Sequence, residues 1–244
     1  MRDMMVRPDG TRMRWVELPG ADPARVFVHG LGASAAPYFT PAATHPALAG
    51  RRTLMVDLLG FGISDRPVDF DYTMEAHADA LAAVLDGAGV KGAEVVAHSM
   101  GGTVAVLLAV RHPHLVSSLV LVDANLDPVH NSRSGIASYT EEEFVAEGWA
   151  RTLERVGPHW AATMRLAGRE ALYRTTVHLI RADVRADLLG LTIPRTFLYP
   201  YADGEPAGAD VLRAGGVRVV PVTDCGHNIM LDNVTGFVEA VAGA

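Results

Sequence analysis

One serine, Ser99, stands in the stretch VVAHSMGG (95–102) between an apolar run and two glycines. Two positions before and after it lie the small residues Ala97 and Gly101, as a sharp turn from a strand into a helix requires. Such a turn exposes the serine hydroxyl at a helix N-terminus, which favours negative charge. Ala97 departs by one methyl group from the usual G-x-S-x-G pattern of this turn. The stretch predicts that Ser99 is a nucleophile, and alone it also fits a helix start without chemistry.

A second stretch, DCGHNIML (224–231), supplies the base that a serine nucleophile needs. Of the ten histidines, only His227 lies near the C-terminus and just beyond a predicted strand. Histidine is the usual general base for a serine because its pKa lies near the working pH. We therefore expect His227 to take the proton of Ser99.

Two carboxylates are candidates for the group that orients His227. Asp203 follows the apolar run at 194–200, one predicted strand before the histidine, and Asp123 ends the run at 117–124. The carboxyl ends of parallel strands meet at one edge of a sheet, so either side chain could reach the Nδ1–H group of His227. Asp127 and Glu205 are less favoured candidates.

Acyl transfer also needs two backbone N–H groups that bind the developing oxyanion. The residue after the nucleophile, Met100, would supply one of them. The other would come from Leu31, in the stretch FVHGLGAS (27–34) that follows a predicted strand. We expect His29 to hold this loop by hydrogen bonds rather than to take part in catalysis.

The elements that must position these groups alternate between strands and helices. Helical spacing over 73–89 and 101–113 predicts helices, and the turn around Pro8-Asp9-Gly10 predicts an N-terminal hairpin. Short apolar runs bounded by turn residues predict strands at 25–30, 52–62, 93–102, 117–124, 194–200 and 217–224. This alternation is typical of an α/β fold with a mostly parallel central sheet flanked by helices.

One segment interrupts the alternation. Between about 127 and 189 no run resembles a strand, and Thr140 followed by Glu143 fits a capping box at the start of a helix. We therefore predict a core formed by 1–125 and 190–244. A helical cap, 126–189, would be inserted after the strand that follows the nucleophile helix.

Composition argues against several classes of partner. The net charge of the 244-residue chain is −7, whereas nucleic-acid binding needs a concentrated basic patch. The single cysteine, Cys225, excludes an intrachain disulfide, and no cluster has the spacing of metal ligands. The N-terminus lacks the apolar region of a signal peptide, and the longest apolar run, 101–110, is too short to span a bilayer. We expect a cytoplasmic protein without cofactor or metal, bound neither to nucleic acid nor to a membrane.

Taken together, the stretches HGLGAS, DLLGFGISD, AHSMGG, LVLVDA and CGHNIML make the chain resemble the α/β-hydrolase superfamily from about residue 12 to the end. The resemblance implies that Ser99 attacks an acyl carbon, that His227 moves the proton, and that Leu31 and Met100 bind the oxyanion. In this family the acid usually follows the strand before the histidine, which makes Asp203 the preferred acid. The stretch YPYADGEP (199–206) departs from the family pattern there, and Asp123 matches the position that some relatives use.

The expected activity is that of a serine hydrolase resembling carboxylic ester hydrolases. It would cleave an ester, thioester, lactone or amide of a small to medium acyl substrate through an acyl-enzyme intermediate. Two alternatives remain open: a non-catalytic member of the same fold that binds a small molecule, and a lyase or acyltransferase that reuses the triad. The sequence leaves the substrate and the oligomeric state open.

Overall fold

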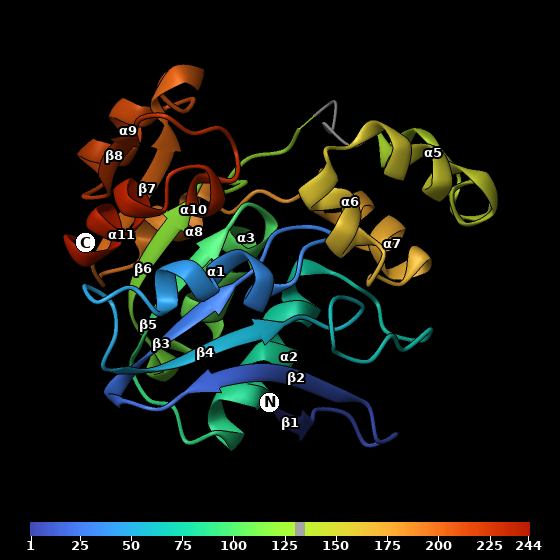
Figure 1. The fold of residues 1–244 in the computed structure, drawn as a ribbon, viewed down its shortest axis with the longest axis horizontal. Coiled ribbons are helices and arrows are strands. Elements are labelled where there is room, and N and C mark those ends of the chain that lie inside the picture. Colours follow the sequence, from blue (N-terminus) through green and yellow to red (C-terminus); the bar gives the residue numbers. More distant parts are fainter. Residues whose placement is uncertain (130–134) are drawn as a thin grey trace.

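An eight-stranded sheet with the order β1-β2-β4-β3-β5-β6-β7-β8 forms the centre of the molecule (Figure 1). The computed structural model describes residues 1–129 and 135–244. β2 runs antiparallel to both of its neighbours, and every other neighbouring pair is parallel. The strands are β1 (Arg2–Met5), β2 (Arg12–Leu18), β3 (Ala21–Val28), β4 (Arg51–Asp57), β5 (Ala93–His98), β6 (Val116–Val122), β7 (Arg195–Pro200) and β8 (Arg218–Val222).

Helices cover both faces of this sheet. Alternate residues of β3 enter opposite cores: Val26 and Val28 pack in the cluster that holds α2 and α3, and Phe27 packs in the cluster that holds α1 and α11. The helices outside the cap are α1 (Ala35–Ala43), α2 (Met74–Gly87), α3 (Met100–Arg111), α9 (Ala209–Ala214), α10 (Ile229–Asp232) and α11 (Val234–Ala242), with 3₁₀ turns η1 (Pro113–Leu115) and η4 (Tyr201–Asp203). The predicted α/β class with a mostly parallel sheet is confirmed.

Local sequence signals explain where several elements begin. Thr73 caps α2 by accepting a hydrogen bond from the Ala76 amide, and the predicted N-terminal hairpin is present, with Met5 opposite Arg12. β5 is buried along its whole length, and β3 and β4 are buried over their last five residues, because a parallel sheet covered on both faces gives each strand a continuous apolar run. No helix within the described residues is long and apolar enough to cross a membrane.

The segment between β6 and β7 is helical wherever the structure describes regular elements in it. It contains η2 (Ile136–Ser138), α4 (Glu141–Glu143), the π-helical η3 (Phe144–Gly148), α5 (Trp149–Arg155), α6 (Pro158–Met164), α7 (Arg169–Leu179) and α8 (Arg185–Gly190). The predicted capping box of Thr140 and Glu143 is present. Figure 1 shows α5, α6 and α7 together beyond the end of the sheet, whereas α8 contacts α3. The exact division between core and cap stays a prediction.

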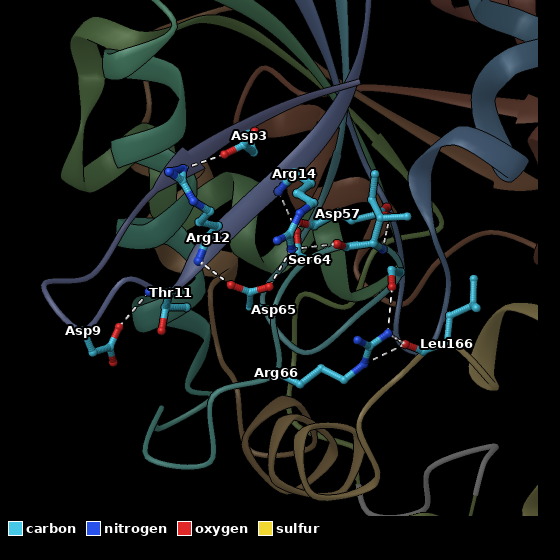
Figure 2. Close-up of polar contacts among 12 residues, drawn as sticks. Asp3, Asp9, Thr11, Arg12, Arg14, Asp57, Ser64, Asp65, Arg66 and Leu166 are labelled. Atoms are coloured by element: carbon cyan, nitrogen blue, oxygen red, sulfur yellow. Dashed lines mark hydrogen bonds and ion pairs between the residues drawn. The ribbon is translucent and has the colours of Figure 1, made fainter.

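Backbone contacts fasten the cap to the loop after β4. The Gly168 amide donates to the Gly60 carbonyl at 2.8 Å. The Arg66 guanidinium donates to the carbonyls of Leu166 and Gly62, at 3.0 and 2.8 Å (Figure 2). Because the bonds to Gly168 and Leu166 join residues about a hundred positions apart, they fix the cap above the loop that follows β4.

The buried carboxylate of Asp57 ties the loop after β4 to the loop after β3. It accepts hydrogen bonds from the Ser34 hydroxyl at 2.9 Å, the Ala35 amide at 2.6 Å and the Ile63 amide at 2.9 Å. Gly62 has φ +52°, and a Cβ there would lie 1.9 Å from the Asp57 carboxylate. Only glycine at position 62 therefore lets the loop after β4 fold around this carboxylate.

We predict that Asp57→Ala lowers the free energy of unfolding by about 3 kcal/mol, because buried donors lose their acceptor. Asp69→Ala is the matched control, since Asp69 is exposed and pairs with Arg7 at the surface. Its expected effect is within about 0.5 kcal/mol. Urea unfolding followed by circular dichroism measures both. Equal small losses would contradict the role given to Asp57.

Candidate active site

The candidate site lies where the strand order reverses, at the carboxyl ends of β3 and β5. Open α/β sheets bind their ligands at such a point. A cavity of about 320 Å³ opens there between the core and the cap. Its lining combines residues from the core loops with residues from the cap: Gly30, Leu31, Ala33, Tyr38, His98, Ser99, Asp123, Ala124, Asn125, Val129, Trp160, Thr176, Leu179, Ile180, His227 and Asn228.

Ser99 occupies the sharp turn that the sequence predicts between β5 and α3. Its φ of 52° and ψ of −121° lie in a region that side-chain-bearing residues rarely adopt. The Ser99 amide donates to the Val122 carbonyl at 2.9 Å, and its carbonyl accepts from the Gly102 amide at 2.9 Å. A Cβ at Gly101 would lie 2.6 Å from the carbonyl oxygen of His29, so a small residue is required there. Ala97 is fully buried in β5, which accommodates its methyl group.

His227 connects Ser99 to a carboxylate. Its Nδ1 lies 2.5 Å from Oδ2 of Asp123, and its Nε2 lies 3.1 Å from Oγ of Ser99. The carboxylate accepts, so Nδ1 carries the ring proton and Nε2 offers its lone pair to the serine hydroxyl. The three groups therefore form one chain of hydrogen bonds along which a proton can move from Ser99 to His227.

The geometry favours Asp123 over the preferred Asp203 as the partner of His227. Asp123 directly follows β6, the neighbour of the strand that carries Ser99. Asp203 lies exposed at the end of η4, which follows Pro200. The sequence order of strands does not reveal this difference, because both aspartates follow a strand of the same sheet.

The two less favoured acids are engaged elsewhere. Asp127 forms two hydrogen bonds with Arg185, at 2.7 and 2.6 Å. Glu205 forms an ion pair with Arg213. Both carboxylates therefore already have a guanidinium partner.

Sequence reasoning did not identify Asn125 as part of the site. Its Oδ1 lies 3.2 Å from Oγ of Ser99, and its backbone carbonyl accepts a hydrogen bond from the Thr103 hydroxyl at 2.7 Å. Ser99 has one hydroxyl proton, so Asn125 and His227 compete for it. The only signal in the sequence is position, two residues beyond Asp123.

Hydrogen bonds from His29 and Ala33 hold the loop after β3, which carries the candidate oxyanion donor Leu31. The Leu58 amide donates to His29 Nε2 at 3.0 Å, so the ring proton lies on Nδ1 and is donated to the Gly30 carbonyl at 2.7 Å. The Ala33 amide donates to the same carbonyl at 3.1 Å. In a trans peptide the N–H points away from the C=O, so these two bonds constrain the Leu31 N–H group from the core side. The expectation that His29 holds this loop is confirmed.

Met100 begins α3, directly after Ser99. The first amides of a helix have no carbonyl partner within it, so the Met100 N–H group is available to an anion beside Ser99.

Within 1–129 and 135–244, no group of three or more His, Cys, Asp or Glu side chains is placed to hold a metal ion.

His98, the residue before the nucleophile, supports the loop that carries His227. Its Nε2–H donates to the backbone carbonyl of His227 at 2.9 Å, and the centres of the two rings lie 4.6 Å apart. Burial, followed by the nearby His227 ring, holds the pKa of His98 well below its usual range. His98 is therefore a neutral donor, a role that the sequence analysis did not assign.

Two further histidines are buried and neutral. Burial lowers the pKa of His29, and it lowers the pKa of His77 to about 3. His77 lies on α2, with Nε2 3.3 Å from the Thr175 hydroxyl of the cap. A histidine in the unfolded chain has a pKa of about 6.5. Below that pH the unfolded chain therefore binds protons at these histidines and the folded chain does not, which favours unfolding.

We predict that the free energy of unfolding decreases as the pH falls from about 6.5 towards 3, by up to about 1.4 kcal/mol per pH unit for each such histidine. His77→Phe removes one of these groups while keeping an aromatic ring, so its slope against pH should be shallower. His159→Gln, at an exposed position of α6, is the control and should keep the wild-type slope. Urea unfolding at a series of pH values measures this. An unchanged slope for His77→Phe would contradict the assignment.

Known proteins resemble this chain in sequence and in fold. The chain is 37% identical over 97 residues to 2-hydroxymuconate semialdehyde hydrolase of Pseudomonas putida. The aligned stretch covers 40% of this chain and 34% of that protein. It is 38% identical over 109 residues to the probable lysophospholipase BODYGUARD 3 of Arabidopsis thaliana, covering 43% and 22%. The match thus spans only about a third, or less, of these curated relatives.

Solved structures match over nearly the whole chain. An esterase from Exiguobacterium antarcticum superposes with a TM-score of 0.81 at 21% identity, covering 100% of this chain and 98% of that one. A mutant of the N-acyl homoserine lactonase AidH, complexed with N-hexanoyl homoserine, gives a TM-score of 0.78 at 18% identity, covering 99% and 94%. The family model described as alpha/beta hydrolase fold matches residues 23–202. The resemblance inferred from the sequence is therefore confirmed, and the chain belongs to the α/β-hydrolase family.

Proposed function

We propose that this protein is a serine hydrolase that cleaves an ester, thioester, lactone or amide through an acyl-enzyme intermediate. The observation that carries the proposal is the chain of hydrogen bonds from Asp123 through His227 to Ser99. In this proposal Asp123 orients His227, and His227 is the general base for Ser99.

In the first half of the reaction, Ser99 Oγ forms a bond to the acyl carbon while its proton passes to His227 Nε2. The carbonyl oxygen becomes an oxyanion, which the N–H groups of Leu31 and Met100 stabilise. When the tetrahedral intermediate collapses, the leaving group takes the proton from Nε2 and departs. The acyl group stays on Ser99.

In the second half, a water molecule attacks the acyl carbon and gives its proton to His227 Nε2. A second oxyanion forms in the same place and is bound by the same two N–H groups. As it collapses, Ser99 Oγ leaves and recovers the proton. The carboxylic acid is released, and the enzyme returns to its starting state.

The cavity favours an acyl group of small to medium size. Its volume is about 320 Å³, and the cap contributes apolar side chains to it, among them Leu179 and Ile180. Pockets of this size enclose small molecules. The names of two matching structures, an esterase and a lactonase, support the ester and the lactone among these bonds.

We predict that a fluorophosphonate forms one stoichiometric adduct, located on Ser99 by intact mass and peptide mapping. Ser99→Ala should give no adduct and should keep the wild-type melting temperature, because it removes a single hydroxyl group. Ser117→Ala, at an exposed position of β6, is the matched control and should label like the wild type. A folded wild-type protein without an adduct would overturn the proposal and favour the non-catalytic binding alternative.

We predict unequal losses for two isosteric substitutions. Asp123→Asn should lower kcat on a labelled ester by about 10⁴-fold, because it leaves His227 in the wrong tautomer. Asp203→Asn should change kcat by less than about twofold, since exposed surface substitutions rarely matter. Steady-state kinetics on both variants checks this. The reverse order of losses would restore Asp203 as the acid.

A further inference from the structure

A side chain of the cap is hydrogen-bonded to the loop that carries Leu31. Trp160, on α6, donates its indole Nε1–H to the Leu31 carbonyl at 2.7 Å. The two residues are 129 positions apart in the sequence, and both line the cavity. A bond of this length lies at the short end of the range for an N–H group and a carbonyl, so the indole holds the loop directly.

The loop after β3 is shaped to receive this ring. Gly32 has φ +65°, and a Cβ on it would lie 2.9 Å from Nε1 of Trp160 and 3.3 Å from the Met164 methyl group. A side chain at this position would therefore push α6 away. The absence of a side chain lets the loop backbone lie directly beneath the cap helix.

Leu31 is consequently fixed from two sides. On its N-terminal side, the Gly30 carbonyl accepts from His29 and from the Ala33 amide, both of which belong to the core. On its C-terminal side, its own carbonyl accepts from Trp160 of the cap. Neither peptide plane that flanks Leu31 can rotate while both sets of bonds are in place.

A second set of contacts holds the chain just beyond α6. The Arg66 guanidinium donates to the Leu166 carbonyl at 3.0 Å, and the Gly168 amide donates to the Gly60 carbonyl at 2.8 Å. Both bonds join the cap to the loop after β4. The position of α6 over the cavity is therefore supported by polar contacts at Trp160 and just after its last residue, Met164.

We propose that Trp160 is a positioning residue that couples the position of cap helix α6 to the orientation of the Leu31 N–H group. When α6 is seated, the indole N–H holds residue 31 in the arrangement that an oxyanion donor needs. Without the indole N–H, the Leu31 carbonyl loses this partner and the loop is held from the core side alone. This inference rests on the proposed function, because it assigns Leu31 to the oxyanion hole.

The expected effect falls on the chemical step. An oxyanion donor acts only when it is already in position as the charge develops, and removal of one donor lowers kcat by about 10² to 10³-fold. A donor that is present but less firmly held should lose part of this contribution. The substrate in its ground state carries no such charge, so its binding should change little.

The test compares two tryptophans of the cap. Trp160→Phe removes the N–H donor and keeps an aromatic ring, and we expect kcat to fall by about tenfold while KM changes by less than about twofold. Trp149→Phe is the matched control, because the buried Trp149 Nε1 has no hydrogen-bond partner in the part of the chain that is described. Its ring packs against the Arg169 guanidinium at 4.4 Å, and kcat should stay unchanged.

A second readout separates positioning from general damage to the pocket. A trifluoromethyl ketone adds to Ser99 and creates an oxyanion, whereas the matching methyl ketone binds without one. Trp160→Phe should weaken only the inhibition by the trifluoromethyl ketone, by about tenfold. Equal weakening of both compounds, or kinetics identical to Trp149→Phe, would overturn the inference.

Two controls keep the outcome interpretable. If Trp160→Phe fails to fold, as judged by circular dichroism, β-(3-benzothienyl)alanine at position 160 repeats the test with sulfur in place of the N–H and the ring size unchanged. Fluorophosphonate labelling of the wild type on Ser99 tests the proposed function separately. A labelled wild type together with an unaffected position-160 variant therefore rejects the coupling and leaves the proposed function intact.

Discussion

The backbone of Ser99 is the constraint on which the rest of the site depends. A side-chain-bearing residue at φ 52° and ψ −121° costs about 1 to 3 kcal/mol, and it persists only where its surroundings enforce it. Here Ser99 directly follows β5, at the centre of the sheet, and its amide donates to the Val122 carbonyl. Gly101 lies close to the backbone at the end of β3, the strand next to β5. Backbone contacts with the sheet, and not the other side chains of the site, therefore set the position of the Ser99 hydroxyl.

Two buried histidines hold the loops on either side of this turn, and each does so in one fixed tautomer. His29 accepts a hydrogen bond from the Leu58 amide at Nε2 and donates from Nδ1 to Gly30, whereas His98 donates from Nε2 to the carbonyl of His227. Burial keeps both rings neutral by lowering the pKa of each, and only a neutral imidazole can combine one donor with one acceptor. The ring of the candidate base, His227, is partly exposed and lies between a carboxylate and the serine. The same residue type thus serves as support where it is buried and as a candidate base where it is accessible.

The sequence predicts the strands and the turn at Ser99 well because both depend on local residue types. Buried parallel strands require continuous apolar runs, and the turn requires small residues at fixed distances. It does not predict α1, where Pro41 interrupts the helical signal. Nor does it choose between Asp123 and Asp203, because that choice depends on where each chain segment leaves the sheet. The contacts of Asn125 with Ser99 and of Trp160 with Leu31 were not predicted for a related reason: they join segments that no spacing rule connects.

The sheet supplies the candidate catalytic groups, whereas the cap supplies much of the apolar lining of the cavity. Ser99, His227, Asp123 and the loop of Leu31 all follow strands of one sheet, so their mutual distances are set by strand pairing. Much of the apolar lining comes instead from the cap, which meets this edge through a small number of polar contacts. Cap side chains can therefore vary in size and polarity while the reacting groups keep their geometry. Trp160 is less free to vary, because it lines the cavity and also donates a hydrogen bond to the loop of Leu31, on which the proposed chemistry relies.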